Sequence, residues 1–178
     1  MLDHLLLDFD DLDRGIAFVE EHTGVRAAFG GVHFGRGTRN ALLSLGPDPK
    51  QPSVRAFTAI TNMTMPRLVG WAAHPGHIGR LAQALREAGV PCDGLQPGSR
   101  ARPDGGMLNW KTLELADDRQ GVLPFFIEWR PDAVPSLHGR PAGRRLQQFA
   151  ILSPVERGES AQCRARITEQ KGDLEIWS

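Results

Sequence analysis

The chain of 178 residues has no tyrosine, only two cysteines and no net charge, and each shortage excludes a class of function. Without tyrosine, no phenol side chain can act as an acid or a base. Cys92 and Cys163 stand far apart and do not form a metal-binding pair, which is typical of reduced thiols in a cytosol. Basic and acidic residues number 21 each, so no overall field attracts nucleic acid or an anionic membrane.

Long apolar segments are also missing. No run approaches the roughly 20 apolar residues that a membrane-spanning helix needs. The first residues do not look like a signal peptide, because a basic region is absent and Asp3 and His4 interrupt the start. We therefore expect a cytoplasmic protein without membrane contact. The 20 glycines and 13 prolines favour many turns and short strands over a helical bundle.

Residues 1–62 have the pattern of one strand, one helix and further strands. Apolar residues alternate up to Phe9, which predicts a half-buried strand with His4 and Asp8 on the face opposite Leu5. In chain order, we expect a strand at 4–9, a helix capped by Asp10 or Asp11 and ended by Gly24, a short strand at 25–29, a glycine-rich loop and a strand at 39–45.

The glycine-rich stretch from Gly30 to Gly46 surrounds one imidazole, His33. A flexible polar loop that leads into a stiff strand is a typical place to hold a small polar ligand. Arg39 and Asn40 stand at this junction, and a guanidinium fork suits a carboxylate or a phosphate.

The same pattern returns in residues 66–130. Sliding the sequence by 66 residues places Leu12 on Ile78 and Arg14 on Arg80, and Gly89 ends the second helix as Gly24 ends the first. Further strands are expected at 68–73, 94–100, 107–115 and 122–129. The repeat predicts two β-α-β-β-β modules, an α+β fold with mixed sheets curled around a cup. A proline-rich link follows, and strands at 146–152, 164–169 and 174–177 predict a C-terminal extension, 131–178, as a partial third β unit at the edge.

These features resemble the vicinal oxygen chelate superfamily (glyoxalase, bleomycin resistance and extradiol dioxygenase proteins), and more narrowly its glyoxalase-like domain proteins. The resemblance spans most of residues 3–130. It rests on these blocks: Asp3-His4-Leu5, the run from Gly31 to Gly46, Asp48 to Pro52, Pro66-Arg67-Leu68 with Trp71-Ala72, Pro97 to Arg100 with Arg102 to Gly105, and Pro124 to Trp129.

The resemblance implies a cup that holds a divalent metal, with His4 as the ligand from the first strand and Glu128 as the carboxylate from the last. Zinc, nickel, manganese and iron are not distinguished, and a site without metal is also open. Gly70 stands opposite His4 in the repeat, so the second module lacks a matching histidine. The candidates for a third ligand are His33, Asp8, His74 and Glu114, and spacing does not choose among them.

The sequence indicates that one strand of the family pattern is deleted directly after Gly46. The segment from Ser53 to Ile60 can substitute for it, although that segment has no carboxylate.

Three functions follow from the resemblance. The first is a divalent-metal-dependent lyase, isomerase or dioxygenase that acts on a small oxygen-rich substrate, with His33 and Glu128 as catalytic residues. The second is a metal-free binding or sequestering protein of the bleomycin-resistance type, and the third is a structural copy whose cup is filled by its own side chains. The expected substrate-binding residues are Arg39, Asn40, Trp71, Ser99, Arg100 and Trp110. By analogy, a homodimer is expected.

Overall fold

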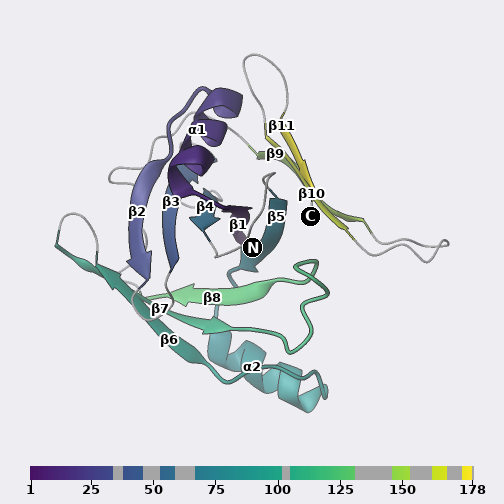
Figure 1. Ribbon diagram of the computed structural model, residues 1–178. Coiled ribbons are helices and arrows are strands. Elements are labelled where there is room, and N and C mark those ends of the chain that lie inside the picture. Colours follow the sequence, from purple (N-terminus) through teal and green to yellow (C-terminus); the bar gives the residue numbers. More distant parts are fainter. Residues whose placement is uncertain are drawn as a thin grey trace.

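The structure is a computed structural model, which describes residues 1–33, 38–45, 53–58, 67–101, 105–130, 146–152, 162–167 and 174–177. Its side chains are described within residues 1–31, 39–45, 67–101 and 105–130. Figure 1 shows one large curved sheet, with α1 and α2 at opposite ends of the molecule and a smaller sheet to one side.

The large sheet has eight strands in the order β2-β3-β4-β1-β5-β8-β7-β6. Its first half consists of β1 (Leu2–Phe9), α1 (Leu12–Thr23), β2 (Ala28–His33), β3 (Thr38–Ser44) and β4 (Ser53–Thr58). Its second half consists of β5 (Arg67–Ala73), α2 (Ile78–Glu87), β6 (Gln96–Ala101), β7 (Met107–Leu113) and β8 (Phe125–Trp129).

The two halves repeat one topology. In each, the first strand pairs in parallel with the last, β1 with β4 and β5 with β8, and antiparallel ladders join the remaining strands. The predicted fold of paired β-α-β-β-β modules is therefore confirmed. The segment expected to substitute for the missing strand does form a strand, because β4 (Ser53–Thr58) occupies the fourth position of the first module and pairs with β1.

An antiparallel ladder between β1 and β5 joins the modules, and its register follows the repeat. Leu5 pairs with Trp71, which is its own counterpart at an offset of 66 residues. His4 pairs with Ala72 and Leu6 pairs with Gly70, so these two pairs are also exchanged by the repeat. A pseudo-twofold axis therefore passes between Leu5 and Trp71.

Local sequence signals set the ends of α1. The carboxylate of Asp11 accepts a hydrogen bond from the Arg14 amide at 2.9 Å, so Asp11 is the N-cap. Gly24 ends the helix with φ of 66°, and its amide donates to the Glu20 carbonyl at 2.7 Å. Both ends were predicted from the sequence, with Asp10 as the alternative cap.

Each helix covers the same face of the large sheet, which is called here the outer face. Against α1 lies an apolar core formed by these residues: Leu5, Leu7, Phe9, Leu12, Ile16, Val19, Ala27, Ala41, Leu43, Leu45, Leu68 and Val122. Against α2 lies a smaller core of Ile78, Ala82 and Leu113, with Phe126 packed beside it. Burying these side chains is the main stabilising term of the fold.

The glycines of β2 correct one expectation. Gly30 and Gly31 lie inside the strand and not in a loop, at an irregularity in the β2–β3 register between Phe29 and Gly31. Gly31 has φ of 131°, a conformation that L side chains rarely adopt. Residues 34–37, the remainder of the expected loop, lie outside the described part.

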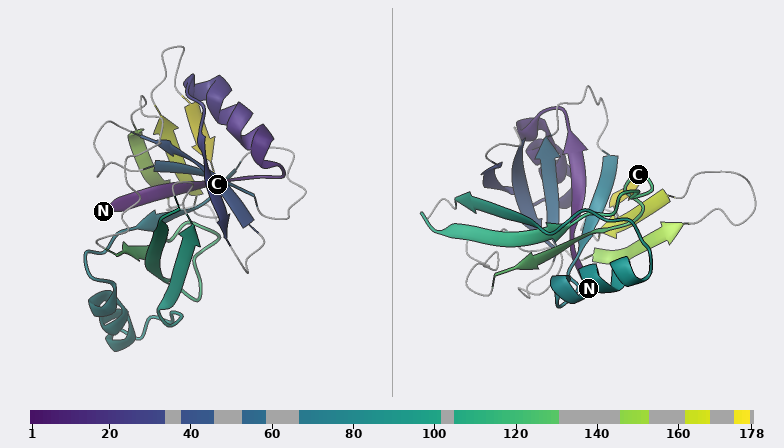
Figure 2. Two further views of the ribbon diagram at one scale, coloured as in Figure 1. Left: turned by 90° about the vertical axis from the view of Figure 1, so that its left-hand side faces the viewer. Right: turned by 90° about the horizontal axis from the view of Figure 1, so that it is seen from below.

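The last three strands form a separate sheet in the order β11-β10-β9, with β9 (Leu146–Leu152), β10 (Gln162–Ile167) and β11 (Leu174–Trp177). Both ladders are antiparallel. This sheet lies near β5, a central strand of the large sheet, and does not extend an outer strand (Figure 2). The domain boundary expected near residue 130 remains a prediction.

The turn before β8 packs closely against β5, and a substitution in this turn tests that contact. A Cβ on Gly121, whose φ is 85°, would lie 2.3 Å from the Val69 carbonyl oxygen, whereas Gly89, with φ of 68°, has open space around it. A left-handed alanine costs about 1–2 kcal/mol at either position. We expect Gly89→Ala to lower the free energy of unfolding by about 1 kcal/mol, and Gly121→Ala by about 3 kcal/mol or more because of the added clash. Urea denaturation measures both, and equal losses would contradict the close approach of this turn to β5.

Candidate functional site

The face of the large sheet turned away from both helices, called here the inner face, carries the polar side chains. Alternation along β1 places His4, Leu6 and Asp8 on it, opposite the core residues Leu5 and Leu7. The buried polar residues of the inner face are His4, Asp8, Asn40, Ser44, Arg100 and Thr112, each at most 6 % exposed. Such groups are costly to bury without partners, so their gathering on one face marks a candidate site.

The imidazole of His4 is held by a carboxylate. Its Nδ1 lies 2.5 Å from Oδ1 of Asp3, and Oδ2 of Asp3 accepts a hydrogen bond from Nε1 of Trp129 at 3.0 Å. Because a carboxylate only accepts, Asp3 favours the tautomer with the proton on Nδ1, which leaves the lone pair on Nε2. The His4 ring also meets Phe125 edge-on, with ring centroids 5.6 Å apart.

The sequence did not reveal the role of Asp3. Strict alternation assigns Asp3 to the face opposite His4, but the β1–β5 register shifts between Leu2 and His4, so a bulge lies at Asp3. The bulge lets the carboxylate reach both His4 and Trp129. The available signal was only the adjacency of an acid and a histidine in the sequence.

Two indoles extend the inner face toward β6. Trp110 and Trp129 pack with ring centroids 5.3 Å apart, and both are partly buried. A Cβ on Gly98 would lie 2.3 Å from Nε1 of Trp110, so the indole lies directly over this glycine. Trp110, predicted to contact substrate, thus belongs to the inner face with His4.

Asn40 is the unusual group of the inner face. Its side chain is 1 % exposed, and neither Oδ1 nor Nδ2 has a hydrogen-bond partner. In the part of the chain that the structure describes, no other buried side-chain nitrogen or oxygen lacks one. Each buried group left unsatisfied costs about 1–3 kcal/mol, so this amide destabilises the protein unless another molecule satisfies it.

Arg100 approaches the same place from the other end of the sheet. The guanidinium Nη1 of Arg100 and Oδ1 of Asn40 both lie within 3.0 Å of the point that a Cβ on Gly30 would occupy. Arg100 is 4 % exposed, so a positive charge is buried beside the unpartnered amide.

Glu128 lies on the outer face, which separates it from His4. Its Oε2 accepts a hydrogen bond from the Ile78 amide at 2.6 Å, at the first turn of α2. In the ladder Glu128 pairs with Lys111, whereas the inner face of β8 presents Phe125, Ile127 and Trp129. The structure therefore does not bring the predicted metal ligands His4 and Glu128 together.

Three predicted substrate contacts are also on the outer face. The guanidinium of Arg39 lies 3.8 Å from the carboxylate of Asp11, and this side chain is 51 % exposed. Nε1 of Trp71 donates to the Val122 carbonyl at 2.9 Å, beside the α1 core. Ser99 is exposed and pairs with Asn109.

The remaining candidates are dispersed. Nδ1 of His74 lies 3.0 Å from the Ile127 carbonyl oxygen, and Glu114 is exposed. The side chain of His33 lies outside the described part. Among the described residues, no three His, Cys, Asp or Glu side chains are grouped so that they could hold a metal ion.

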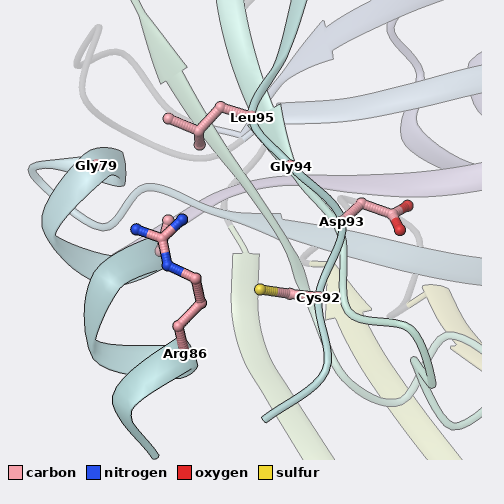
Figure 3. Close-up of a pocket in the computed structure, with 7 residues that line it drawn as sticks. Gly79, Arg86, Cys92, Asp93, Gly94 and Leu95 are labelled. Carbon is pink, nitrogen blue, oxygen red and sulfur yellow. The ribbon is translucent and has the colours of Figure 1, made fainter. Parts of the chain in front are cut away.

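A pocket of about 290 Å³ lies away from the inner face, between α2 and residues 92–95 (Figure 3). Its lining residues are Gly79, Ala82, Arg86, Cys92, Asp93, Gly94 and Leu95. Its charged residues, Arg86 and Asp93, are exposed, and Cys92 packs against the α2 core. The inner face, with its buried polar groups, is therefore the better candidate site.

Comparison with models of protein families shows to which family this chain belongs. The model of the glyoxalase-like domain matches residues 2–162. The chain belongs to the glyoxalase-like domain family. Solved structures share the fold of this chain, whereas no curated protein matches it.

Three solved structures illustrate the likeness of this glyoxalase-like protein. A hypothetical protein from Staphylococcus aureus has a TM-score of 0.66 at 15% identity, covering 99% of this chain and 84% of that one. Methylmalonyl-CoA epimerase from Mycobacterium tuberculosis has a TM-score of 0.56 at 19% identity, covering 76% and 91%. A variant of the Streptomyces coelicolor epimerase, in complex with 2-nitronate-propionyl-CoA, has a TM-score of 0.53 at 19% identity, covering 71% and 94%. At these identities, they show the fold.

The described residues of this glyoxalase-like protein do not fit the metal site implied by the resemblance. One expected ligand, His4, pairs with Asp3 on the inner face, and the other, Glu128, bonds α2 on the outer face. The second module offers Gly70 where the first has His4.

No described helix has both the length and the apolar character to cross a membrane.

The Glu128 contact leads to a measurable expectation. Glu128→Ala removes the acceptor of the Ile78 amide, and losing a cap at a helix start costs about 0.5–2 kcal/mol. We expect the free energy of unfolding to fall by about 1 kcal/mol, measured by urea denaturation in the presence of a chelator. Glu21→Ala, at an exposed position of α1, is the matched control and should leave it unchanged. A loss that occurs only when a divalent metal is added would identify Glu128 as a ligand instead.

Proposed function

We propose that this glyoxalase-like protein binds a small oxygen-rich molecule on its inner face. The observation that carries the proposal is the gathering of buried polar side chains there, while the outer face is apolar beneath α1 and α2. Buried polar groups weaken a core that serves packing alone. Their retention on one face is explained by a ligand that uses them.

The aromatic side chains support the same proposal. Trp110, Trp129 and Phe125 provide flat apolar surfaces on the same face as His4 and Arg100, and apolar walls with few polar groups are typical of small-molecule sites. The Streptomyces coelicolor epimerase, which has the same fold, is solved in complex with 2-nitronate-propionyl-CoA. We extend to this chain only the idea that a curled sheet of this type accepts a small acid or acyl group.

A panel of small molecules tests this proposal. We expect at least one among dicarbonyls, catechols and aromatic acids to raise the melting temperature, because a ligand at 100 times its Kd adds about 2.7 kcal/mol, or several degrees for a chain of this size. Indole fluorescence of Trp110 and Trp129 should change on binding. If no compound alters either signal, the inner face is only a structural core.

Proton transfer is a second candidate function, favoured by the Asp3–His4 pair. Asp3 holds the Nδ1 proton of His4, so Nε2 can accept a proton from a bound carbon acid and return it. Trp129 holds the other oxygen of Asp3 and thereby fixes the carboxylate. This arrangement suits an isomerase or epimerase step, in which one base removes a proton from carbon and returns it.

The metal-dependent lyase, isomerase or dioxygenase expected from the resemblance is a separate proposal. A divalent ion would polarise adjacent substrate oxygens, but the described residues do not present a donor set that fits one. We therefore derive no step through a metal. The homodimer and the cytoplasmic location remain predictions.

Asp3→Asn tests the proton-transfer candidate. An asparagine has one side-chain oxygen, and if that oxygen keeps the Trp129 bond, its NH₂ faces His4 and reverses the tautomer. We expect ring-nitrogen NMR to show the His4 proton on Nδ1 in the wild type and on Nε2 in the variant. Deuterium uptake from D₂O at the acidic carbon of methylmalonyl-CoA should occur in the wild type only. Exchange that is unchanged in the variant would exclude the Asp3–His4 pair from the step.

A further inference from the structure

The two outermost strands of the large sheet, β2 and β6, approach one another at one corner of the molecule (Figure 1). A Cβ on Gly31 would lie 3.0 Å from Cδ of Arg100 and 3.4 Å from the Ala101 carbonyl oxygen. The side chain of Arg100 therefore crosses from β6 onto the backbone of β2. This corner, called here the seam, is defined by Gly30, Gly31, Asn40 and Arg100.

The seam is built to keep polar groups close. A Cβ on Gly30 would lie 2.3 Å from Oδ1 of Asn40 and 3.0 Å from Nη1 of Arg100. Any larger residue at 30 or 31 would displace one of these side chains. The paired glycines therefore make room for an amide and a guanidinium at one place, although neither atom of the amide bonds to the guanidinium.

The side-chain amide of Asn40 shows which hydrogen-bonding groups are missing from the seam. With Oδ1 and Nδ2 both unpartnered and the side chain 1 % exposed, it needs one hydrogen-bond donor and one acceptor at the same time. The adjacent Arg100 favours negative charge on the acceptor. A carboxylate with a hydroxyl on the neighbouring carbon presents this combination, because the carboxylate accepts and the hydroxyl donates.

We propose that the seam is a binding subsite for a small 2-hydroxycarboxylate, held by Asn40 and Arg100. The inference rests on the proposed binding function of the inner face and names the ligand class and the residues that select it. The carboxylate accepts from Arg100 and from Nδ2 of Asn40, and the hydroxyl donates to Oδ1. Trp110, which lies over Gly98 two residues along β6 from Arg100, gives an aromatic substituent a surface to contact.

Three related compounds test separately whether binding requires the hydroxyl and the negative charge of the ligand. Mandelate has the carboxylate, the hydroxyl and an aromatic ring, phenylacetate lacks the hydroxyl, and mandelamide lacks the charge. We expect calorimetry to give mandelate the lowest Kd, with phenylacetate and mandelamide each weaker by about tenfold or more, the effect of losing one hydrogen bond to a charged or buried partner. Equal affinity for all three would overturn the assignment of ligand class.

Asn40→Leu separates binding from folding. The substitution replaces an unsatisfied amide with an apolar side chain of similar size, so we expect the ligand-free variant to melt at the same temperature as the wild type or higher. Mandelate affinity should fall by about tenfold to a hundredfold. Asn109→Leu, on the other face of β7 between Leu108 and Trp110, is the matched control and should bind mandelate as the wild type does.

The outcomes distinguish a failure of the seam as a subsite from a failure of the inner face as a binding site. If Asn40→Leu binds mandelate normally while the ring signals of His4 or Trp129 respond to the ligand, the seam is excluded and the inner face remains the site. If Asn40→Leu is destabilised and mandelate binds neither protein, an ordered water satisfies the amide and the seam has no ligand role. If no compound of the broader panel binds, the proposed function itself fails.

Discussion

The structure depends on the burial of strand β1 on both of its faces. Leu5, Leu7 and Phe9 are at most 5 % exposed beneath α1, and His4 and Asp8 are equally buried on the inner face. Since β4 and β5 flank this strand, its backbone polar groups are also paired. Burial on both faces fixes the register of β1 against its neighbours. A register shift of one residue would turn its apolar side chains to the inner face and its polar side chains to the outer face.

The inner and outer faces divide the predicted site residues. His4, Asn40, Arg100 and Trp110 lie on the inner face, where burial strengthens hydrogen bonds and makes missing ones costly. Glu128, the carboxylate expected among them, instead holds the first turn of α2. The carboxylate that contacts His4 is that of Asp3, which lies on the same strand.

The architecture was accessible from the sequence because it rests on local signals. The offset of 66 residues, the caps at Asp11 and Gly24 and the alternation in β1 are each read from a few neighbouring residues. The site was less accessible. Alternation shows that Glu128 and Ile127 point in opposite directions, but only the position of α2 shows which direction leads inward. The bulge at Asp3 breaks the same alternation, and no sequence period reveals it.

The contact of Leu5 with Trp71 has an evolutionary consequence. Two separate, identical modules that met on a twofold axis would place the same amino acid on both sides of it, since one codon would specify both. Here the axis is flanked by an aliphatic and an aromatic residue, and the imidazole of His4 corresponds to the bare backbone of Gly70. In one chain, separate codons specify the two sides of the axis, so the two halves of this protein can carry different residues at equivalent positions.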